Sequence, residues 1–239
     1  MKKSSMLSKI TFDMLYQKGN WALGFLLVLL LLHVGMGIGT SIGLNVRSEF
    51  AEEDFLSLAF RSSKGFLLVI GILSAYGFLS YYVKMGLTRK DFYYGAVLST
   101  GILSLLFPLV AGTIQLVLGL FMNGSINSAI LQEFNNNWLH FVTAYSIQNF
   151  FFYLMGWLIG TGFYRYDWIR GIGFIAIAVV GIAVIDGLWQ YELESFWGNW
   201  LPITFGEMPF LATLAVSLAV IVVALILIRF MSRKITIRM

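Results

Sequence analysis

Few residues of this chain have the types and spacing that enzyme chemistry needs. There is no cysteine, which excludes a thiolate metal site and a cysteine nucleophile. The two histidines, His33 and His140, are far apart and lack the spacing of a zinc-protease helix. Residues 39–43 fit the G-x-S-x-G pattern of hydrolases, but they stand in a long apolar segment without the strand-to-helix turn that this pattern requires. No G-x-x-x-x-G-K-[ST] phosphate loop is present either, so the sequence predicts no enzyme and no cofactor bound by this chain.

Four polar residues stand inside apolar segments and are candidates for a site within the membrane: His33, Gln148, Asn149 and Asp186. Polar groups at such positions indicate function or hydrogen bonds between helices. For His33, Gln148 and Asn149, a hydrogen bond between helices is the simpler interpretation, and contact with a transported molecule is the alternative. Asp186 is expected near the outer end of its segment, with no basic residue at similar depth to act with it in a proton relay.

The elements that must position these groups are membrane helices. Of the 239 residues, 59% are apolar and 12% are charged, whereas a soluble domain has about twice that charged fraction. A backbone exposed to lipid must be helical, and segments of about 20 apolar residues are long enough to cross the membrane. The predicted fold is an all-α integral membrane protein, with one transmembrane domain over 1–239 and six spans at about 21–44, 65–83, 94–122, 138–164, 171–191 and 209–230.

The first 20 residues are predicted to form an amphipathic helix that lies along the inner membrane surface. Met6, Ile10 and Met14 recur near one helical face, while Lys9 and Lys18 lie largely on other faces. A plain basic anchor at the N-terminus is an equally good interpretation.

The distribution of charge predicts the topology. With the N-terminus inside, only Arg47, Arg61 and Lys64 of the 16 lysines and arginines fall outside, and most acidic residues fall outside too. Because cytoplasmic loops are enriched in Lys and Arg, both termini are expected in the cytoplasm. The basic charge is thus a topology signal, and no nucleic-acid partner is expected.

One connection has a distinct motif, after the second predicted span. It reads Gly86-Leu87-Thr88-Arg89-Lys90-Asp91-Phe92. Gly86 can end a helix, and Thr88 can cap the next one, with Asp91 at the third following position. A short basic helix over about 88–93 is expected, and an ordinary positively charged loop is the alternative.

The order of these features resembles the permeases of ABC type-2 exporters. These have an amphipathic N-terminal helix, six spans and a Gly-x-[Ser/Thr]-Arg-x-[acidic/polar]-Phe motif after the second span. The resemblance implies that residues 86–92 form a coupling helix, which docks into a separate cytoplasmic ATPase that binds ATP and Mg²⁺. It also implies that the apolar stretch 196–203, broken by Gly198 and Pro202, is a re-entrant segment before the last span. Small Gram-positive members, such as peptide-immunity permeases and the phenol-soluble modulin exporter, have a similar size.

The function implied by this resemblance is export of an apolar or amphipathic cargo, such as a peptide, a toxin or a lipid-like compound, across a bacterial plasma membrane. A second permease copy or a similar subunit is expected as a partner. Gly35, Gly39 and Gly43 form a small-residue stripe that fits either such a dimer contact or packing inside one subunit. Export and immunity roles both remain open. The alternative functions are a membrane scaffold or sensor and, less favoured, a membrane-embedded enzyme.

Overall fold

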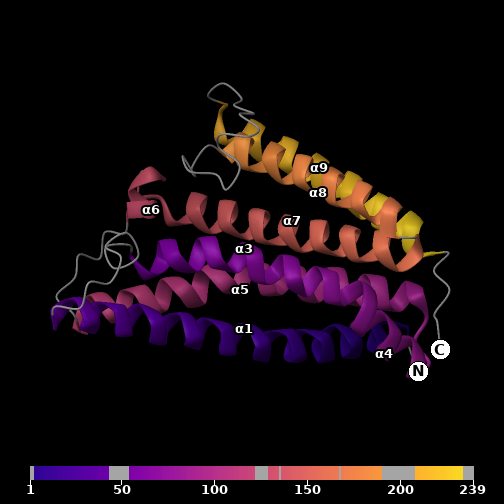
Figure 1. The fold of residues 1–239 in the computed structure, drawn as a ribbon, viewed down its shortest axis with the longest axis horizontal. Helices are drawn as coiled ribbons and strands as arrows, with labels where there is room; N and C mark the ends of the chain where they lie inside the picture. The colour runs from indigo at the N-terminus through magenta and orange to yellow at the C-terminus, as the bar shows by residue number, and fades with distance from the viewer. Residues whose placement is uncertain are drawn as a thin grey trace.

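The computed structural model describes residues 3–42, 54–121, 129–134, 136–166, 168–189 and 208–233, and most of them are helical (Figure 1). The elements are α1 (Lys3–Ser41), α3 (Phe55–Leu73), the π-helix η1 (Ser74–Phe78), α4 (Leu79–Lys84), α5 (Arg89–Phe121), α6 (Ala129–Glu133), α7 (Trp138–Arg165), α8 (Trp168–Trp189) and α9 (Phe210–Ser232). No strand occurs among the described residues, so the all-α prediction is confirmed. The predicted re-entrant segment 196–203 lies outside the described residues.

Several helices are long and apolar enough to cross a membrane, which is consistent with a multi-pass membrane protein. Five stretches meet this description: Met6–Gly39, Phe55–Lys84, Arg89–Leu120, Trp168–Trp189 and Phe210–Ser232. α7 has a similar length but does not meet this description, and it carries His140, Gln148 and Asn149. It lies in the middle of the bundle and packs against α3, α5, α8 and α9 (Figure 1). A helix enclosed by other helices does not need an apolar surface all around.

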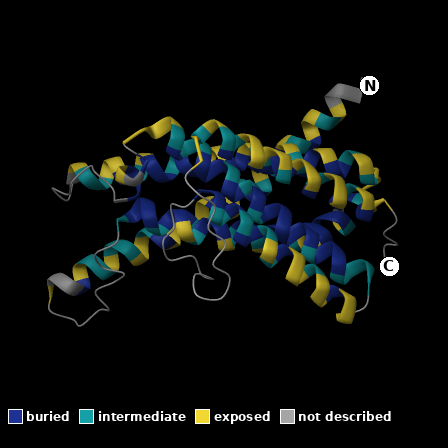
Figure 2. Cartoon of the chain, turned by 90° about the horizontal axis from the view of Figure 1, so that it is seen from above, coloured by how far each residue is buried: buried dark blue, intermediate teal, exposed yellow. Residues whose placement is uncertain are grey.

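The outward faces of the bundle are apolar. Figure 2 shows buried residues along the middle of the bundle and exposed ones on the outer sides of the helices. Large apolar side chains are exposed on α5, α8 and α9, among them Leu105, Leu109, Ile177, Val180, Val223 and Ile226. Apolar surfaces of this extent are rare on soluble monomers. They are the surfaces that a lipid bilayer would cover.

The N-terminal residues do not form a separate helix. Instead, α1 runs without a break from Lys3 to Ser41, so the predicted boundary at residue 20 is wrong. At about 1.5 Å per residue, such a helix is longer than the hydrocarbon core is thick. The physical reason is a continuous buried stripe along α1: Ile10, Met14, Lys18, Ala22, Leu26 and Leu29. This stripe contributes to the packing of α1 on α5, its main helical neighbour.

The second helical stretch starts about ten residues earlier than predicted, at Phe55 instead of residue 65. Asp54 caps it, because its carboxylate accepts hydrogen bonds from the Ser57 backbone nitrogen (3.3 Å) and from the Ser57 hydroxyl (2.7 Å). Phe55 and Leu56 are fully buried, so the first turn is part of the core. Consequently Lys64 lies inside the bundle and not in an outer loop.

α3 and α7 approach each other closely at three glycines. A methyl group at Gly156 would overlap the carbonyl oxygen of Leu68, and one at Gly71 would overlap the carbonyl oxygen of Tyr153. A methyl group at Gly160 would lie 2.7 Å from the carbonyl oxygen of Ile72. The G-x-x-x-G pair that brings two helices together inside the subunit is therefore Gly156 and Gly160.

Candidate functional site

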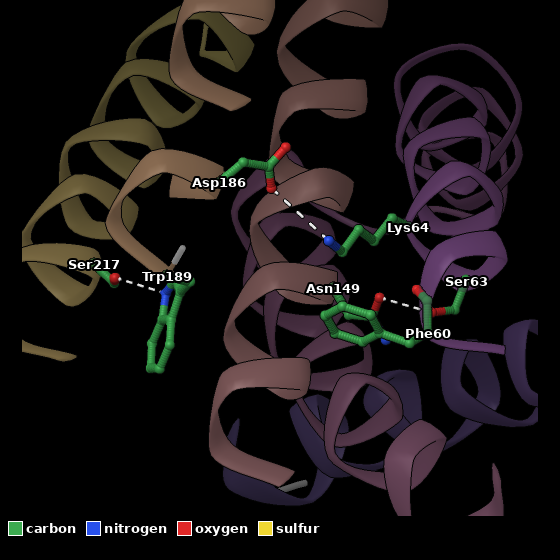
Figure 3. Close-up of polar contacts among 7 residues, drawn as sticks. All are labelled: Phe60, Ser63, Lys64, Asn149, Asp186, Trp189 and Ser217. Carbon is green, nitrogen blue, oxygen red and sulfur yellow. Dashed lines mark hydrogen bonds and ion pairs between the residues drawn. The ribbon is translucent and has the colours of Figure 1, made fainter. Parts of the chain in front are cut away.

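A lysine and an aspartate meet in the interior of the bundle, between α3 and α8 (Figure 3). Lys64 lies in the middle of α3, and Asp186 lies in the last turn of α8. The Lys64 Nζ atom is 3.8 Å from Asp186 Oδ1, and only 5% and 9% of the two side chains are exposed. Both helices pack against α7, so this ion pair links two helices on different sides of the central one.

The Lys64–Asp186 pair corrects the expectation that Asp186 has no basic partner in another helix. The sequence placed Lys64 in the outer connection, but the early start of α3 at Phe55 carries it into the bundle. An ionisable residue at membrane depth indicates function by default, and its partner is part of that hypothesis. Together the two residues are the best candidate for a functional site.

Two aromatic rings lie close to the Lys64 ammonium, and the preceding residue bonds to an amide on α7. Its Nζ atom lies 4.2 Å from the centroid of the Phe60 ring and 5.6 Å from that of Phe152. The neighbouring Ser63 donates a hydrogen bond of 3.0 Å to Asn149 Oδ1 on α7 (Figure 3). The Asn149 Nδ2 group is buried and has no hydrogen-bond acceptor among the described residues. The predicted candidate Asn149 is thus linked through Ser63 to the ion pair. We call Lys64, Asp186, Ser63 and Asn149, with the rings of Phe60 and Phe152, the polar cluster.

The other predicted polar residues have different surroundings. Gln148 is buried on α7 next to Asn149 in the chain. His33 is half-buried on α1, and its ring meets the Phe55 ring edge-on with a centroid distance of 5.8 Å. The structure therefore brings Asn149 and Asp186 together around α3, while His33 packs against the start of that helix.

The energetics of the Lys64–Asp186 pair favour a role beyond stability. At 3.8 Å, two unit charges attract each other by about 4 kcal/mol at an effective dielectric constant of about 20. The cost of removing each charge from water is several kcal/mol. Because cost and gain are similar, well-packed apolar residues would serve as well for stability alone. The arrangement can instead hold α3 and α8 in one relative position, or exchange its partners for charged groups of a ligand.

A second buried lysine lies nearer the other end of the bundle, and the sequence did not reveal it. The Lys18 ammonium donates hydrogen bonds to the hydroxyl oxygens of Thr100 (2.8 Å), Tyr153 (3.2 Å) and Ser99 (3.3 Å). The Tyr153 hydroxyl in turn donates a hydrogen bond of 3.0 Å to Ser74 in η1. These residues connect α1, α5, α7 and the π-helix through one charge. π-Helical turns inside α-helices occur frequently at functional sites.

Lys18 could have been found from its spacing. It follows Ile10 and Met14 at intervals of four residues and precedes Ala22 by the same interval, and all four are buried. Such a spacing puts a lysine on the packed face of α1 rather than on the polar face. The positive charge of Lys18 had instead predicted a position on the cytoplasmic surface.

The predicted turn and cap between the second and third helical stretches are confirmed. Gly86 has a φ of +89°, a left-handed conformation that favours glycine. Its backbone nitrogen donates to the Val83 carbonyl (3.0 Å), and the Leu87 nitrogen donates to the Tyr82 carbonyl (3.1 Å), which is a Schellman motif. Thr88 Oγ1 then accepts a hydrogen bond of 3.2 Å from the Asp91 backbone nitrogen. We call Lys84–Phe92 the α4–α5 corner.

The α4–α5 corner contains no separate short helix, because Arg89 begins the long helix α5. Phe92 is 2% exposed and lies among core aromatics, with its ring centroid 6.0 Å from that of Trp157. Arg89 is directed to the end of α9, where its Nη1 atom donates a hydrogen bond of 3.1 Å to the Arg233 carbonyl. The exposed charges of the corner are Lys84 and Lys90.

The predicted glycine stripe of α1 has no close neighbour at Gly35. Gly35 lies on an exposed face, with open space where a side chain would start, and Gly39 is buried. Gly43 lies outside the described residues. The stripe as a dimer contact stays a prediction.

In the described part of the chain, no group of three or more His, Asp or Glu residues is arranged to hold a metal ion. Comparison of the chain with protein-family models, with curated proteins and with solved structures finds no match. The functional argument therefore depends on the geometry and chemistry of the residues themselves.

Proposed function

We propose that this chain is the transmembrane permease subunit of an ATP-binding-cassette exporter, which is driven by a separate cytoplasmic ATPase. The observation that best supports the proposal is the α4–α5 corner. The Gly86 turn and the Thr88 cap fix this corner at the ends of two long helical stretches. A force applied to a corner held in this way moves the helices, whereas an unstructured loop would absorb it. The partner ATPase would bind ATP and Mg²⁺.

The arrangement of the helix ends supports six spans with both termini in the cytoplasm. Near the start of α1, Asp13 accepts a hydrogen bond of 2.8 Å from the Tyr82 hydroxyl on α4. At the end of α9, the Arg233 carbonyl accepts one from Arg89 at the start of α5. The start of α1 and the end of α9 thus lie at the same end of the bundle, near the α4–α5 corner (Figure 1). An even number of crossings follows if α7 is the sixth span.

Reporter fusions test whether α7 crosses the membrane. We expect a reporter after residue 239 to be active on the same side as one before residue 3, because six crossings return the chain to its starting side. A reporter between residues 122 and 128 should be active on the opposite side. Reporters at the two ends that are active on opposite sides would mean five crossings and would contradict the proposed topology.

The polar cluster suits an amphipathic cargo, such as a peptide, a toxin or a lipid-like compound. It combines the charged groups of Lys64 and Asp186 with the rings of Phe60 and Phe152. Aromatic rings offer a large contact area without fixed hydrogen-bond geometry, while the charges can bind polar ends of the same molecule. A second permease copy, or a similar subunit, would complete the pathway of the cargo across the membrane.

Charge reversal at the α4–α5 corner tests the ATPase contact. We expect the double variant Lys84→Glu/Lys90→Glu to reduce co-purification of the proposed ATP-binding-cassette ATPase by at least about tenfold, since complementary charges steer and hold such contacts. Both side chains are exposed, so the fold should be retained. The measurement is the ATPase-to-permease ratio after purification from membranes.

The matched control is Arg170→Glu, which reverses an exposed charge near the start of α8. We expect it to leave the ratio unchanged. Equal ratios for the corner variant and the wild-type chain would show that the corner is only a topology signal. Phe92→Ala is unsuitable for this test, because Phe92 belongs to the core and its loss would affect folding.

The Lys64–Asp186 pair favours one other candidate, a transporter driven by an ion gradient. Paired ionisable groups within membrane helices are typical of ion pathways and proton relays. Vesicles that contain only this chain separate the two functions. Uptake or release driven by an imposed ion gradient, without ATPase or ATP, would support the second candidate and contradict the first.

A further inference from the structure

Three arginines converge on the last turn of α9, from three different helices. Arg89 begins α5, Arg165 ends α7, and Arg229 lies on α9 itself. The Arg89 Nη1 atom donates a hydrogen bond of 3.1 Å to the Arg233 carbonyl, and the Arg165 Nη1 atom donates one of 3.1 Å to the Met231 carbonyl. We call Arg89, Arg165 and Arg229 the arginine cluster.

The charge of the arginine cluster is only partly balanced. The carbonyl groups at the end of α9 supply roughly half a negative charge, whereas the cluster carries three positive charges. Within the described segments, no carboxylate forms an ion pair with any of the three guanidinium groups. The Arg229 Nη1 group is buried and has no hydrogen-bond acceptor there. At the end of α9, one buried donor thus lacks an acceptor, and the three positive charges exceed what the α9 carbonyl groups balance.

Aromatic residues mark the depth of the arginine cluster in the membrane. The Arg229 guanidinium lies 5.1 Å from the centroid of the Tyr93 ring and 6.0 Å from that of Tyr94. The Arg165 guanidinium lies 5.0 Å from the Tyr166 ring centroid. Tyrosine and tryptophan are enriched where the hydrocarbon core meets the headgroups. These aromatic neighbours favour a depth near the lipid phosphates for the guanidinium groups.

We propose that the arginine cluster is a binding site for the phosphate headgroup of an anionic phospholipid. Arginine presents a planar fork of donors that fits phosphate oxygens, often with two parallel hydrogen bonds. Arg89 and Arg165 each use one nitrogen on a carbonyl of α9 and have others left for the phosphate. Basic pockets between membrane helices bind acidic headgroups in this way. A lipid is the fitting source of the phosphate because the acyl chains can lie on the exposed apolar face of α9, at Leu227 and Phe230.

The arginine cluster and the proposed ATPase contact consist of different residues. Lys84 and Lys90 are exposed, whereas Arg89 is bonded to the end of α9. The two sets meet at one ring, because the Lys90 ammonium and the Arg229 guanidinium each lie 6.0 Å from the Tyr94 ring centroid. Variants of the two sets therefore test different proposals, and either one can fail alone.

Native mass spectrometry of the whole chain, purified from membranes and exposed to equal amounts of phosphatidylglycerol and phosphatidylcholine, tests the lipid site. We expect the wild-type chain to retain phosphatidylglycerol preferentially, by about fivefold per arginine involved. The preference should disappear in Arg165→Gln/Arg229→Gln and persist in Lys84→Gln/Lys90→Gln, which removes two exposed charges at the same end. Arg229→Lys should keep part of the preference, because it retains the charge but loses the fork.

Three results would overturn the proposal. One is equal retention of both lipids by the wild-type chain. Another is full displacement of phosphatidylglycerol by millimolar inorganic phosphate, which would identify a site for free phosphate. The third is loss of preference in the Lys84/Lys90 control as well, which would indicate diffuse attraction by the basic surface. Circular dichroism of each variant verifies its helix content, and a variant that loses it is replaced by the single change Arg165→Gln.

Discussion

Replacing Lys64 by Met should destabilise the bundle by about 3–5 kcal/mol, because it removes the ammonium beside the buried Asp186 carboxylate. Asp186 has 9% of its side chain exposed and lies 3.8 Å from the Lys64 ammonium, so solvent cannot replace the lost charge. Asp186→Leu should have an effect of similar size, since it removes the carboxylate that lies 3.8 Å from the buried ammonium. Unfolding of each purified variant in mixed detergent micelles gives the free energies.

The double variant Lys64→Met/Asp186→Leu should recover most of the lost free energy, because it removes both charges of the pair together. Lys90→Met is the matched control for lysine removal at an exposed position, and it should change stability by less than about 1 kcal/mol. Additive effects of the two single changes in the double variant would contradict the coupling between Lys64 and Asp186. Transport by a stable double variant then shows whether the charges also act on cargo.

Such a test separates stability from function because apolar residues can replace the pair in the folded state but not in a transport cycle. When α3 and α8 move apart, each charge needs a new partner, which can be water or a charged group of the cargo. The Asn149 Nδ2 group, which has no hydrogen-bond acceptor among the described residues, also needs a partner when these helices move. Loss of transport at normal stability would therefore identify these residues as part of the pathway.

The helices could be predicted well from the sequence, because each segment in contact with lipid must itself be apolar and helical. Every apolar run at membrane length corresponds to a helix, and the predicted segment 138–164 coincides with α7 to within one residue. The Gly86 turn and the Thr88 cap were also predictable, since backbone hydrogen bonds at a helix end depend on residues a few positions apart.

The partners of buried polar groups were not predictable from the same patterns. Lys64 and Asp186 are separated by more than a hundred residues, and nothing local indicates that they meet. The charge of Lys64 favoured an outer loop, while Asp54 at the cap and two buried residues after it placed the helix start earlier. Likewise, the charge of Lys18 favoured a surface position, although hydroxyl groups of α5 and α7 accept hydrogen bonds from its ammonium in the core.

The two small-residue motifs show the same limit. Both the α1 stripe with Gly35 and the α7 pair of Gly156 and Gly160 have the four-residue spacing that permits close helix packing. For the first, the sequence left a dimer contact and packing inside one subunit equally open. In the folded chain, the second touches the backbone of α3, whereas Gly35 has open space around it. Which stripe packs inside the subunit depends on the neighbouring helix, and that is a property of the whole fold.

The close approach of α3 and α7 makes Gly156 the glycine with the largest expected effect. We expect Gly156→Leu to prevent stable folding, because even its first carbon would overlap the carbonyl of Leu68, and backbone cannot move aside as a flexible side chain can. The smaller change Gly156→Ala should cost at least about 1–3 kcal/mol, the usual range for overpacking. Detergent-resistant monomer yield and unfolding free energy are the measurements.

Gly173→Ala on α8 and Gly35→Ala on α1 are the matched controls, because a methyl group at either glycine meets nothing within 4 Å. Both should leave folding intact, and each can add up to about 1 kcal/mol of stability by replacing glycine inside a helix. A second copy that packs on the α1 stripe would make Gly35→Ala different: the subunit would stay folded, but the dimer fraction would fall. Measuring mass together with stability thus assigns each glycine motif to its own interface. Equal tolerance of alanine at Gly156 and Gly173 would contradict the close contact between α3 and α7.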